Sequence, residues 1–125
     1  MEKIIAIKGI VIRGDGRGRK LGFPTANIAL QQETLEGIYA AHVSVDGKTY
    51  QAASFVGAAK TFDKTEAHLE SYLLDFDDDL YGKEITVTLY QKIRDNKKFD
   101  SVEALIEQMK QDVKEIRALF ANQPE

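Results

Sequence analysis

The sequence predicts a mainly β domain, a closed or nearly closed antiparallel barrel of about six strands in a Greek-key-like order, followed by a C-terminal α-helix. Three observations lead to this prediction. Short segments rich in β-branched and aromatic residues follow one another, with turn residues between them. An Asp-Gly pair at 46–47 separates two of these segments. After residue 100 the apolar residues recur at helical spacing instead of alternating. Short strands at such regular intervals are typical of barrels.

Length and composition favour one domain covering residues 1–125. The chain has 43% hydrophobic residues and no cysteine, and no apolar run approaches the roughly 20 residues needed to cross a bilayer. We therefore expect a cytoplasmic protein without a membrane partner. The net charge is −3, but residues 1–27 carry a balance of +4 and the rest of the chain −7. A basic segment on an acidic body favours a small phosphorylated ligand over a nucleic acid.

The first strands follow from alternation and turn chemistry. Residues 3–12 are rich in isoleucine and valine and predict a strand, whereas residues 28–34 give no clear assignment. Residues 37–45 and 48–56 predict a hairpin, because Asp46-Gly47 supplies the two positive-φ residues of a type I′ turn.

The second half of the chain predicts two more strands, at 66–76 and 84–94, and then the helix. Ser101 or Asp100 can cap that helix, and Asp100 with Glu103 has the spacing of a capping box. The helix shows one apolar stripe, formed by Val102, Leu105, Ile106, Met109, Val113, Ile116 and Phe120.

A glycine-rich segment between residues 14 and 27 is the strongest functional signal. Four of the nine glycines fall within nine residues, next to Arg17, Arg19 and Lys20. Glycine allows the backbone N–H groups to form an anion-binding concavity, so the segment predicts a phosphate-binding loop, with a solvated surface loop as the alternative. Thr25 and Asn27 would face one side of an extended segment and offer oxygen ligands suited to Mg²⁺. The predicted nucleotide-binding residues are Gly14, Gly16, Gly18, Lys20, Gly22, Thr25 and Asn27.

This segment closes on Gly22-Phe23-Pro24-Thr25-Ala26-Asn27, which resembles the signature of the riboflavin kinase family. The resemblance implies that the glycine loop holds the phosphates of ATP and that Thr25 and Asn27 coordinate the metal. It covers nearly the whole chain, in order, through Gly37-Ile38-Tyr39, Glu70-Ser71-Tyr72-Leu73-Leu74-Asp75-Phe76, Asp79-Leu80-Tyr81-Gly82-Lys83, Ile93-Arg94 and Lys98-Phe99-Asp100-Ser101.

The predicted strand at 66–76 has two largely apolar faces, and each contains a carboxylate. We therefore expect a carboxylate on the face that points inward, where an apolar setting raises its pKa and makes it a better proton acceptor. The resemblance implies that Glu70 is the catalytic base. Glu66 is its rival, and an exposed glutamate at a strand edge is the structural alternative.

The resemblance also implies that the segment from Arg94 to Phe99 helps to form a flavin pocket, with Arg94, Asp95 and Phe99 as candidates. Without it these residues would be an ordinary strand end and a hydrophobic contact before a helix. One departure concerns Gly57-Ala58-Ala59-Lys60-Thr61-Phe62, where the family usually has proline and this chain has Lys60. Losing the proline frees φ and restores an N–H donor, so we expect a more mobile loop there and an effect on flavin affinity.

The expected function is that of a riboflavin kinase, which converts riboflavin and ATP to FMN and ADP with Mg²⁺ or another divalent metal. Two alternatives stay open: a flavin-binding or regulatory module without turnover, and a small RNA-binding β-barrel. In bacteria such domains commonly form the C-terminal half of a bifunctional FAD synthetase, so the resemblance leaves open an adenylyltransferase domain in a longer parent chain. Nothing in this sequence resembles that half, and FAD synthesis is not expected of it.

Overall fold

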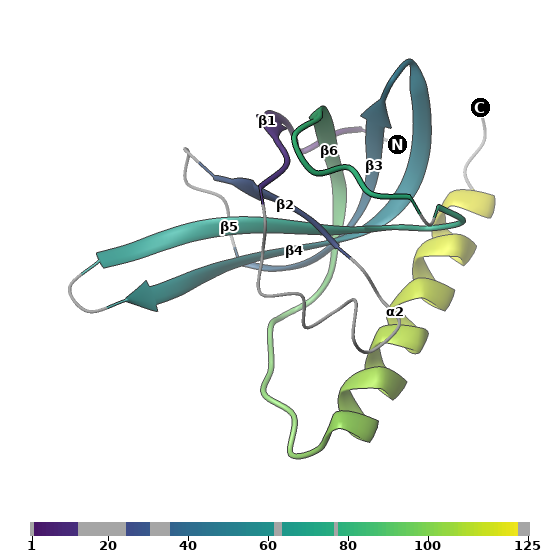
Figure 1. The fold of residues 1–125 in the computed structure, drawn as a ribbon. Coiled ribbons are helices and arrows are strands. Elements are labelled where there is room, and N and C mark those ends of the chain that lie inside the picture. The colour runs from purple at the N-terminus through teal and green to yellow at the C-terminus, as the bar shows by residue number, and fades with distance from the viewer. Residues whose placement is uncertain (1, 13–24, 31–35, 62–63, 77, 123–125) are drawn as a thin grey trace.

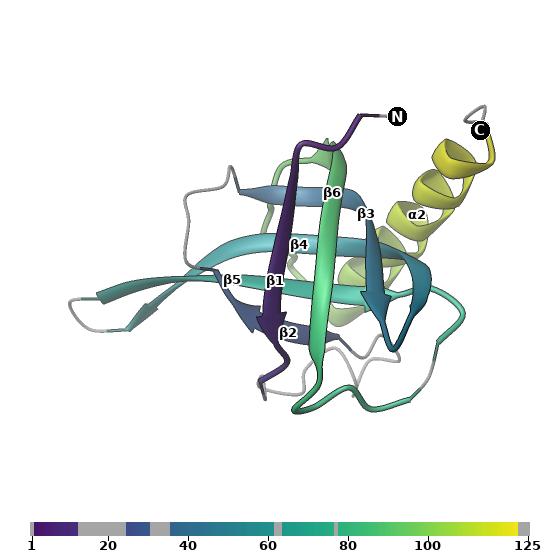
Figure 2. The ribbon, with the colours of Figure 1, turned by 90° about the horizontal axis from the view of Figure 1, so that it is seen from above.

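The computed structural model describes residues 2–12, 25–30, 36–61, 64–76 and 78–122 (Figure 1). These residues form a strongly curved antiparallel sheet with one long helix packed against its outer face (Figures 1 and 2). The elements are β1 (Ile5–Ile10), β2 (Ala26–Ala29), β3 (Gly37–Val45), β4 (Lys48–Thr61), β5 (Lys64–Leu73), β6 (Glu84–Arg94) and α2 (Val102–Ala121).

The sheet has the strand order β1-β6-β3-β4-β5-β2, with every neighbouring pair antiparallel. The two end strands approach each other where the Ile12 N–H donates to the carbonyl oxygen of Asn27 at 2.7 Å. Gly9 and Ile28 also meet at this seam, because a Cβ on Gly9 would lie only 3.3 Å from the Cβ of Ile28. The sheet is therefore a nearly closed barrel, and the predicted fold class is confirmed.

The β3–β4 hairpin has the predicted turn, with φ of 52° at Asp46 and 79° at Gly47. β4 does not end at residue 56, however, but continues to Thr61, and Lys60 pairs with Thr65 of β5. The prediction of a mobile loop at 57–62 is therefore wrong for residues 57–61, because they continue strand β4. Together the ends of β4 and β5 form a two-stranded arm that projects from the barrel (Figures 1 and 2).

The bounds of β1 and β5 differ from the prediction as well, and β2 was not predicted. β1 is shorter than the predicted 3–12, and β2 lies at Ala26–Ala29, overlapping the start of the segment that gave no assignment. β5 ends at Leu73 instead of 76, because the chain turns there with a positive φ of 60° at Asp75. The carboxylate of Asp75 accepts two hydrogen bonds from the guanidinium of Arg117 on α2, at 2.9 and 3.0 Å.

The barrel interior is filled by alternate residues of the strands. Its fully buried members are largely Ile, Leu and Val. One polar pair lies among them, because the hydroxyl groups of Ser54 on β4 and Ser71 on β5 are hydrogen-bonded to each other at 2.8 Å and are shielded from solvent. A hydroxyl can both donate and accept a hydrogen bond, so each serine is the hydrogen-bond partner of the other.

Helix α2 begins after Ser101, whose Oγ accepts a hydrogen bond from the Ala104 N–H at 3.1 Å. Of the two predicted caps, Ser101 is therefore the one used. The later part of the predicted apolar stripe packs on the outer face of the sheet around Ile116, which is fully buried, whereas its first member, Val102, is 52% exposed. Within the described residues no helix is long and apolar enough to cross a bilayer.

Candidate active site

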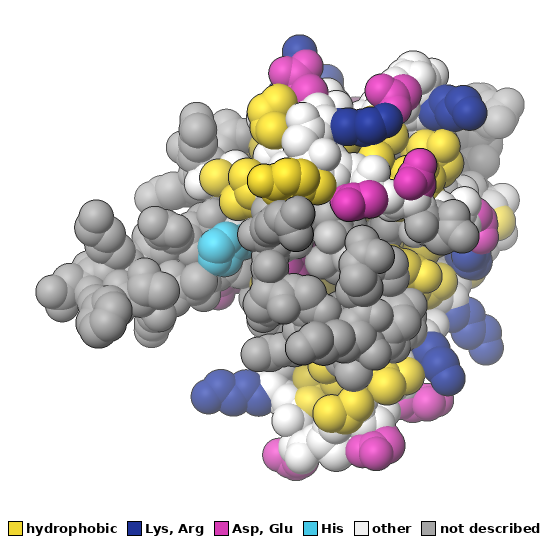
Figure 3. All heavy atoms as spheres, in the orientation of Figure 1, with side chains coloured by type: hydrophobic (Ala, Val, Ile, Leu, Met, Phe, Trp, Pro, Cys, Tyr) yellow, Lys and Arg dark blue, Asp and Glu magenta, His cyan; other side chains and the backbone are white. Residues whose placement is uncertain are grey.

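A cleft of about 1000 Å³ lies between the outer face of the barrel and the N-terminal part of α2. Its floor comes from β3, β4 and β5, and its walls come from the segment after β6 and from the first half of the helix. Apolar side chains are exposed at the end of the molecule where α2 begins (Figure 3). The cleft is lined by Thr25, Ile38, Ala53, Phe55, Glu70, Tyr72, Arg94, Asn96, Lys97, Lys98, Phe99, Asp100, Ser101, Val102, Leu105, Met109, Asp112 and Val113.

Glu70 lies on the cleft side of β5 and is half-buried there. The opposite face of the strand carries Leu69, Ser71 and Leu73, all buried inside the barrel. The expectation of a carboxylate on the inward face is therefore wrong. β5 ends at Leu73, so Asp75 falls in the following turn and is exposed instead of lying inside the barrel.

Two of the other predicted residues lie beside Glu70. Asn27 on β2 is its direct cross-strand partner, and Thr25 lines the same cleft. Ala26 and Ile28 are buried, which by strand alternation puts Thr25 and Asn27 on the opposite, outer face. The Asn27 amide donates to the backbone carbonyl of Thr25 at 3.5 Å. Thr25 and Glu70 thus line the cleft, and Asn27, which is not one of its lining residues, stands beside Glu70 on the same face of the sheet.

The remaining nucleotide-binding predictions lie outside the described residues. Glu66, the rival candidate, belongs to the projecting arm, where its backbone is paired with that of Ala59 on β4. Within the described part of the chain, no cluster of three His, Cys, Asp or Glu side chains could hold a metal ion. Any metal here would rely on the few oxygen donors of the site together with phosphate and water, which is the usual way that Mg²⁺ binds. The predictions outside the described residues are Gly14, Gly16, Gly18, Lys20 and Gly22.

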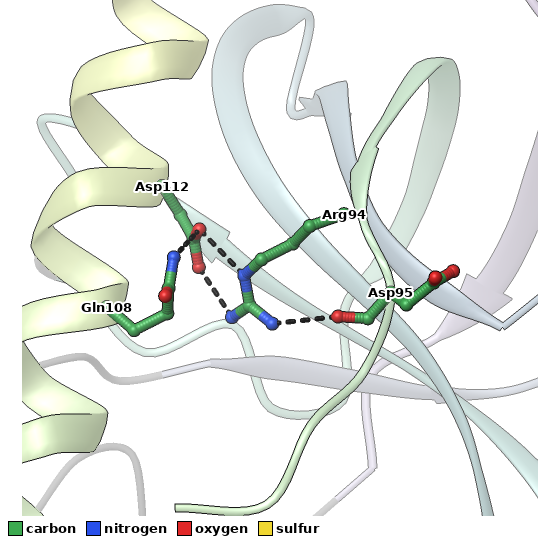
Figure 4. Close-up of polar contacts among 4 residues, drawn as sticks. All are labelled: Arg94, Asp95, Gln108 and Asp112. Carbon is green, nitrogen blue, oxygen red and sulfur yellow. Dashed lines mark hydrogen bonds and ion pairs between the residues drawn. The ribbon is translucent and has the colours of Figure 1, made fainter.

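Arg94 lines the cleft, and its guanidinium is held on several sides (Figure 4). Nε and Nη2 donate to the two carboxylate oxygens of Asp112 on α2 at 2.8 and 2.7 Å, and Nη1 donates to the carbonyl of Asp95 at 3.0 Å. The side chain of Asp112 is only 5% exposed and that of Arg94 19%. Gln108 donates to Asp112 as well, at 2.9 Å. This buried ion pair fastens the end of β6 to the helix and so shapes one wall of the cleft.

Asp95 and Phe99 have different positions. The carboxylate of Asp95 is exposed and forms an ion pair with Lys92, which holds the pKa of Asp95 below its usual range. Asp95 does not line the cleft, although its carbonyl supports Arg94. Phe99 does line it, and the Cζ atom of Arg94 lies 5.9 Å from the centre of its ring.

Sequence reasoning missed Asp112 and Asn96, which both line the cleft. A signal for Asp112 was present, because it follows Leu105 and Met109 and precedes Ile116 at helical spacing. An acidic residue within an apolar stripe needs a buried partner, and Arg94 is that partner. Asn96 carried no comparable signal, because its environment depends on how the segment after β6 folds back over β4.

Comparisons with known proteins identify the family of the chain. The family model described as riboflavin kinase matches residues 1–120. The trifunctional protein RibF/MnmA of Mycoplasmoides gallisepticum is 45% identical over 120 residues, which cover 94% of this chain and 18% of that protein. The bifunctional riboflavin kinase/FMN adenylyltransferase of Listeria monocytogenes is 42% identical over 118 residues, covering 91% of this chain and 38% of the relative. The chain thus spans well under half the length of these relatives.

A solved structure extends the comparison to the fold. The crystal structure of riboflavin kinase from Trypanosoma brucei superposes with a TM-score of 0.64 at 26% identity and covers 98% of this chain and 83% of that one. The RNA-binding riboflavin kinase RibR of Bacillus subtilis is 38% identical over 109 residues, covering 86% of this chain and 47% of the relative. From the match of the family model over residues 1–120, the chain belongs to the riboflavin kinase family.

Proposed function

We propose that residues 1–125 form a single domain that transfers the terminal phosphoryl group of ATP to the ribityl 5′-hydroxyl of riboflavin, giving FMN and ADP. The observation that carries this proposal is the meeting of Thr25, Asn27 and Glu70 on the outer face of the sheet, where Thr25 and Glu70 line a large cleft and Asn27 is paired with Glu70. Phosphoryl transfer depends on positioning and on charge stabilisation, and this site offers both a carboxylate and neutral oxygen donors.

In this proposal Glu70 is the general base. Its carboxylate takes the proton of the 5′-hydroxyl, the hydroxyl oxygen forms a bond to the γ-phosphorus, and the bond from that phosphorus to the bridging oxygen breaks. The electron pair of the broken bond leaves on ADP. Glu70 can serve because it lies in the cleft and is half-buried, so that a bound substrate would shield it from water.

The basic glycine-rich segment supplies the rest of the nucleotide site in this proposal. Lys20 and the N–H groups around Gly14, Gly16, Gly18 and Gly22 would hold the phosphates. This segment directly precedes Thr25, so phosphates bound there would be brought toward the side of the cleft where Glu70 lies.

The hydroxyl of Thr25 and the amide oxygen of Asn27 fit a hard divalent cation, because both are neutral oxygen donors that leave room for phosphate oxygens and water. We propose Mg²⁺ as the physiological ion, with other divalent metals as substitutes. When bound, the ion would neutralise charge on the transferred phosphoryl group.

The flavin would occupy the apolar part of the cleft, between the barrel and α2. Side chains such as Phe55, Leu105 and Met109 offer the surface that a planar aromatic ring requires. Phe99 would add to this surface directly. Arg94 and Asp95 would contribute by building the wall, since the described contacts of Arg94 go to Asp112 and to the Asp95 carbonyl.

A product assay tests the proposal. The protein is incubated with riboflavin, ATP and Mg²⁺, and riboflavin, FMN and FAD are separated by chromatography. We expect FMN without FAD. Flavin binding without FMN, across several divalent metals and nucleotides, would favour the module without turnover. Salt-sensitive RNA binding together with indifference to riboflavin would favour the RNA-binding barrel.

Two further expectations concern the setting of the domain. The family relationship leads us to propose that the chain works in the cytoplasm, where ATP is available, and that a longer parent chain would add an adenylyltransferase domain. The acidic balance outside residues 1–27 leads us to expect no nucleic-acid partner. Cell fractionation tests the location, and a gel-shift experiment with RNA tests the last expectation.

A further inference from the structure

Asn96 follows the last strand and lines the cleft. Its Nδ2 group donates a hydrogen bond to the backbone carbonyl of Val56 on β4 at 3.2 Å, which ties the segment after β6 to the barrel. The other end of the amide, Oδ1, is buried and has no hydrogen-bond partner among the described residues. Buried polar atoms are nearly always paired in folded proteins, so this one calls for an explanation.

The orientation of this amide is fixed by its neighbour. A carbonyl oxygen accepts hydrogen bonds and cannot donate them, so the end of the amide that faces Val56 must be the NH₂ group. Turning the amide over would set two oxygens against each other and leave the NH₂ group without its acceptor. The unmatched atom is therefore an acceptor, and what would satisfy it is an N–H or O–H donor.

The position of Asn96 indicates where that donor comes from. Val56 follows Phe55, and Phe55 is the direct cross-strand partner of Glu70. Phe55, Glu70 and Asn96 all line the same cleft, so a molecule that fills it lies against the residue that carries the unmatched oxygen.

We propose that Asn96 Oδ1 accepts a hydrogen bond from the substrate and makes Asn96 a specificity-determining residue of the cleft. Naming the ligand rests on the proposed function. Oxidised riboflavin carries two kinds of donor, the single ring N–H at N3 and the hydroxyl groups of the ribityl chain. Both satisfy a buried carbonyl oxygen, and a ligand without the donor would leave it unpaired, which costs affinity.

Binding of three ligands to three proteins tests the inference. Riboflavin carries both donors, N3-methylriboflavin lacks the ring N–H, and lumiflavin lacks the ribityl hydroxyls. Dissociation constants are measured by calorimetry for the wild type, Asn96→Ala and Gln108→Ala. Gln108→Ala is the matched control, because it removes an amide that supports the same wall through Asp112. Thermal melts show whether each variant is folded.

We expect Asn96→Ala to weaken riboflavin binding by about 5- to 30-fold, the usual effect of a lost buried hydrogen bond. If the donor is the ring N–H, lumiflavin loses affinity by a similar factor and N3-methylriboflavin does not. If the donor is a ribityl hydroxyl, N3-methylriboflavin loses affinity by that factor and lumiflavin does not. Gln108→Ala should change all three dissociation constants by one common factor or leave them unchanged.

An equal loss for all three ligands with Asn96→Ala would mean that Asn96 only anchors the segment, and would overturn the inference. Unchanged binding would overturn it too. If Asn96→Ala does not fold, Asn96→Ser replaces it, because serine removes the Oδ1 acceptor but keeps a hydroxyl at this position, and it should show the same ligand-dependent loss. If the wild type forms FMN and Asn96→Ala loses affinity equally for all three ligands, only this inference is refuted and the proposed function stands. A wild type that binds no flavin would refute the proposed function.

Discussion

Asn27 on β2 and Glu70 on β5 stand directly opposite each other in the sheet. Side chains of such partners lie on one face, with Cβ atoms about 5 Å apart, so the amide and the carboxylate share one small region. The seam of the barrel passes through the same place, because the carbonyl of Asn27 accepts the hydrogen bond from Ile12 that brings the two end strands together. Closing the barrel therefore also assembles the proposed metal ligand beside the proposed base.

Replacing Glu70 by alanine or glutamine is expected to lower turnover by about 10²- to 10⁴-fold, the usual contribution of a general base. Nucleotide affinity should be preserved, because Glu70 is not assigned to the phosphates. Steady-state kinetics and calorimetry with ADP measure the two effects. Glu84→Gln is the control, since Glu84 is an exposed carboxylate on β6 that does not line the cleft. Unchanged turnover in Glu70→Gln would remove Glu70 from this role.

Asn27→Ala and Thr25→Ala are expected to raise the Mg²⁺ concentration needed for half-maximal turnover, because each removes an oxygen donor. Chelation of divalent metal should abolish turnover in every variant. The measurement is a metal titration at saturating riboflavin and ATP. Thr49→Ala provides the control, since its hydroxyl pairs with Ser44 on the exposed part of the β3–β4 hairpin. An unaltered Mg²⁺ requirement in both Asn27→Ala and Thr25→Ala would contradict the proposal that these residues bind the metal.

Removing Asp112 should destabilise the fold, because it leaves the guanidinium of Arg94 without its main partner in a largely buried setting. We expect Asp112→Ala to lower the free energy of unfolding by about 3 kcal/mol, measured by urea denaturation. The double variant Arg94→Met/Asp112→Leu should recover most of the loss, since neither charge remains. Glu84→Gln, which breaks the exposed pair with Lys8, should have little effect. Equal losses in Asp112→Ala and Glu84→Gln would refute this explanation.

Stability should depend on pH through His42. Its ring stacks on Phe120 of α2 with 4.6 Å between centroids, and its Nδ1 lies 3.2 Å from the hydroxyl of Tyr90. Burial lowers the pKa of His42 from its ordinary value of 6.5. The unfolded chain then binds the proton more readily, so stability is retained above pH 6.5 and falls as the pH drops from there toward the folded-state pKa.

Urea denaturation between pH 5.5 and 8 measures this dependence. His42→Phe should flatten the decrease below pH 6.5, because a phenyl ring can stack on Phe120 and carries no proton. His68→Gln keeps the contacts of His42 with Phe120 and Tyr90 and should retain the decrease. A decrease of the same size in His42→Phe and the wild type would assign it to other groups.

The elements predicted well were those with strong local signals. Residues 37–45 and 84–94 form strands with the predicted bounds, since alternation and the Asp-Gly turn are properties of neighbouring residues. β2 was not assigned, because four residues are too few for a pattern and their pairing partner lies far along the chain in β5. The end of β5 was placed too late, because the turn at Asp75 is stabilised by Arg117 on a distant helix.

The site shows the same division. The placement of Thr25, Asn27 and Glu70 close together on one face of the sheet agrees with a resemblance that could be found in the sequence, although their roles stay predictions. The direction of Glu70 could not be inferred, because both faces of its strand are largely apolar and only the barrel decides which is inside. The engagement of Arg94 with Asp112 likewise depends on how α2 docks.

The buried serine pair sets the alignment of β4 with β5. If the two strands slipped by two residues, the same faces would still point inward, but Ser54 would stand opposite Leu69 or Leu73 and both hydroxyls would be stranded among apolar groups. Each stranded hydroxyl would cost about 1–3 kcal/mol. The serine pair thus fixes the register of β4 and β5. Because Glu70 directly precedes Ser71 in the chain, the same pair keeps the proposed base opposite Phe55 and Asn27.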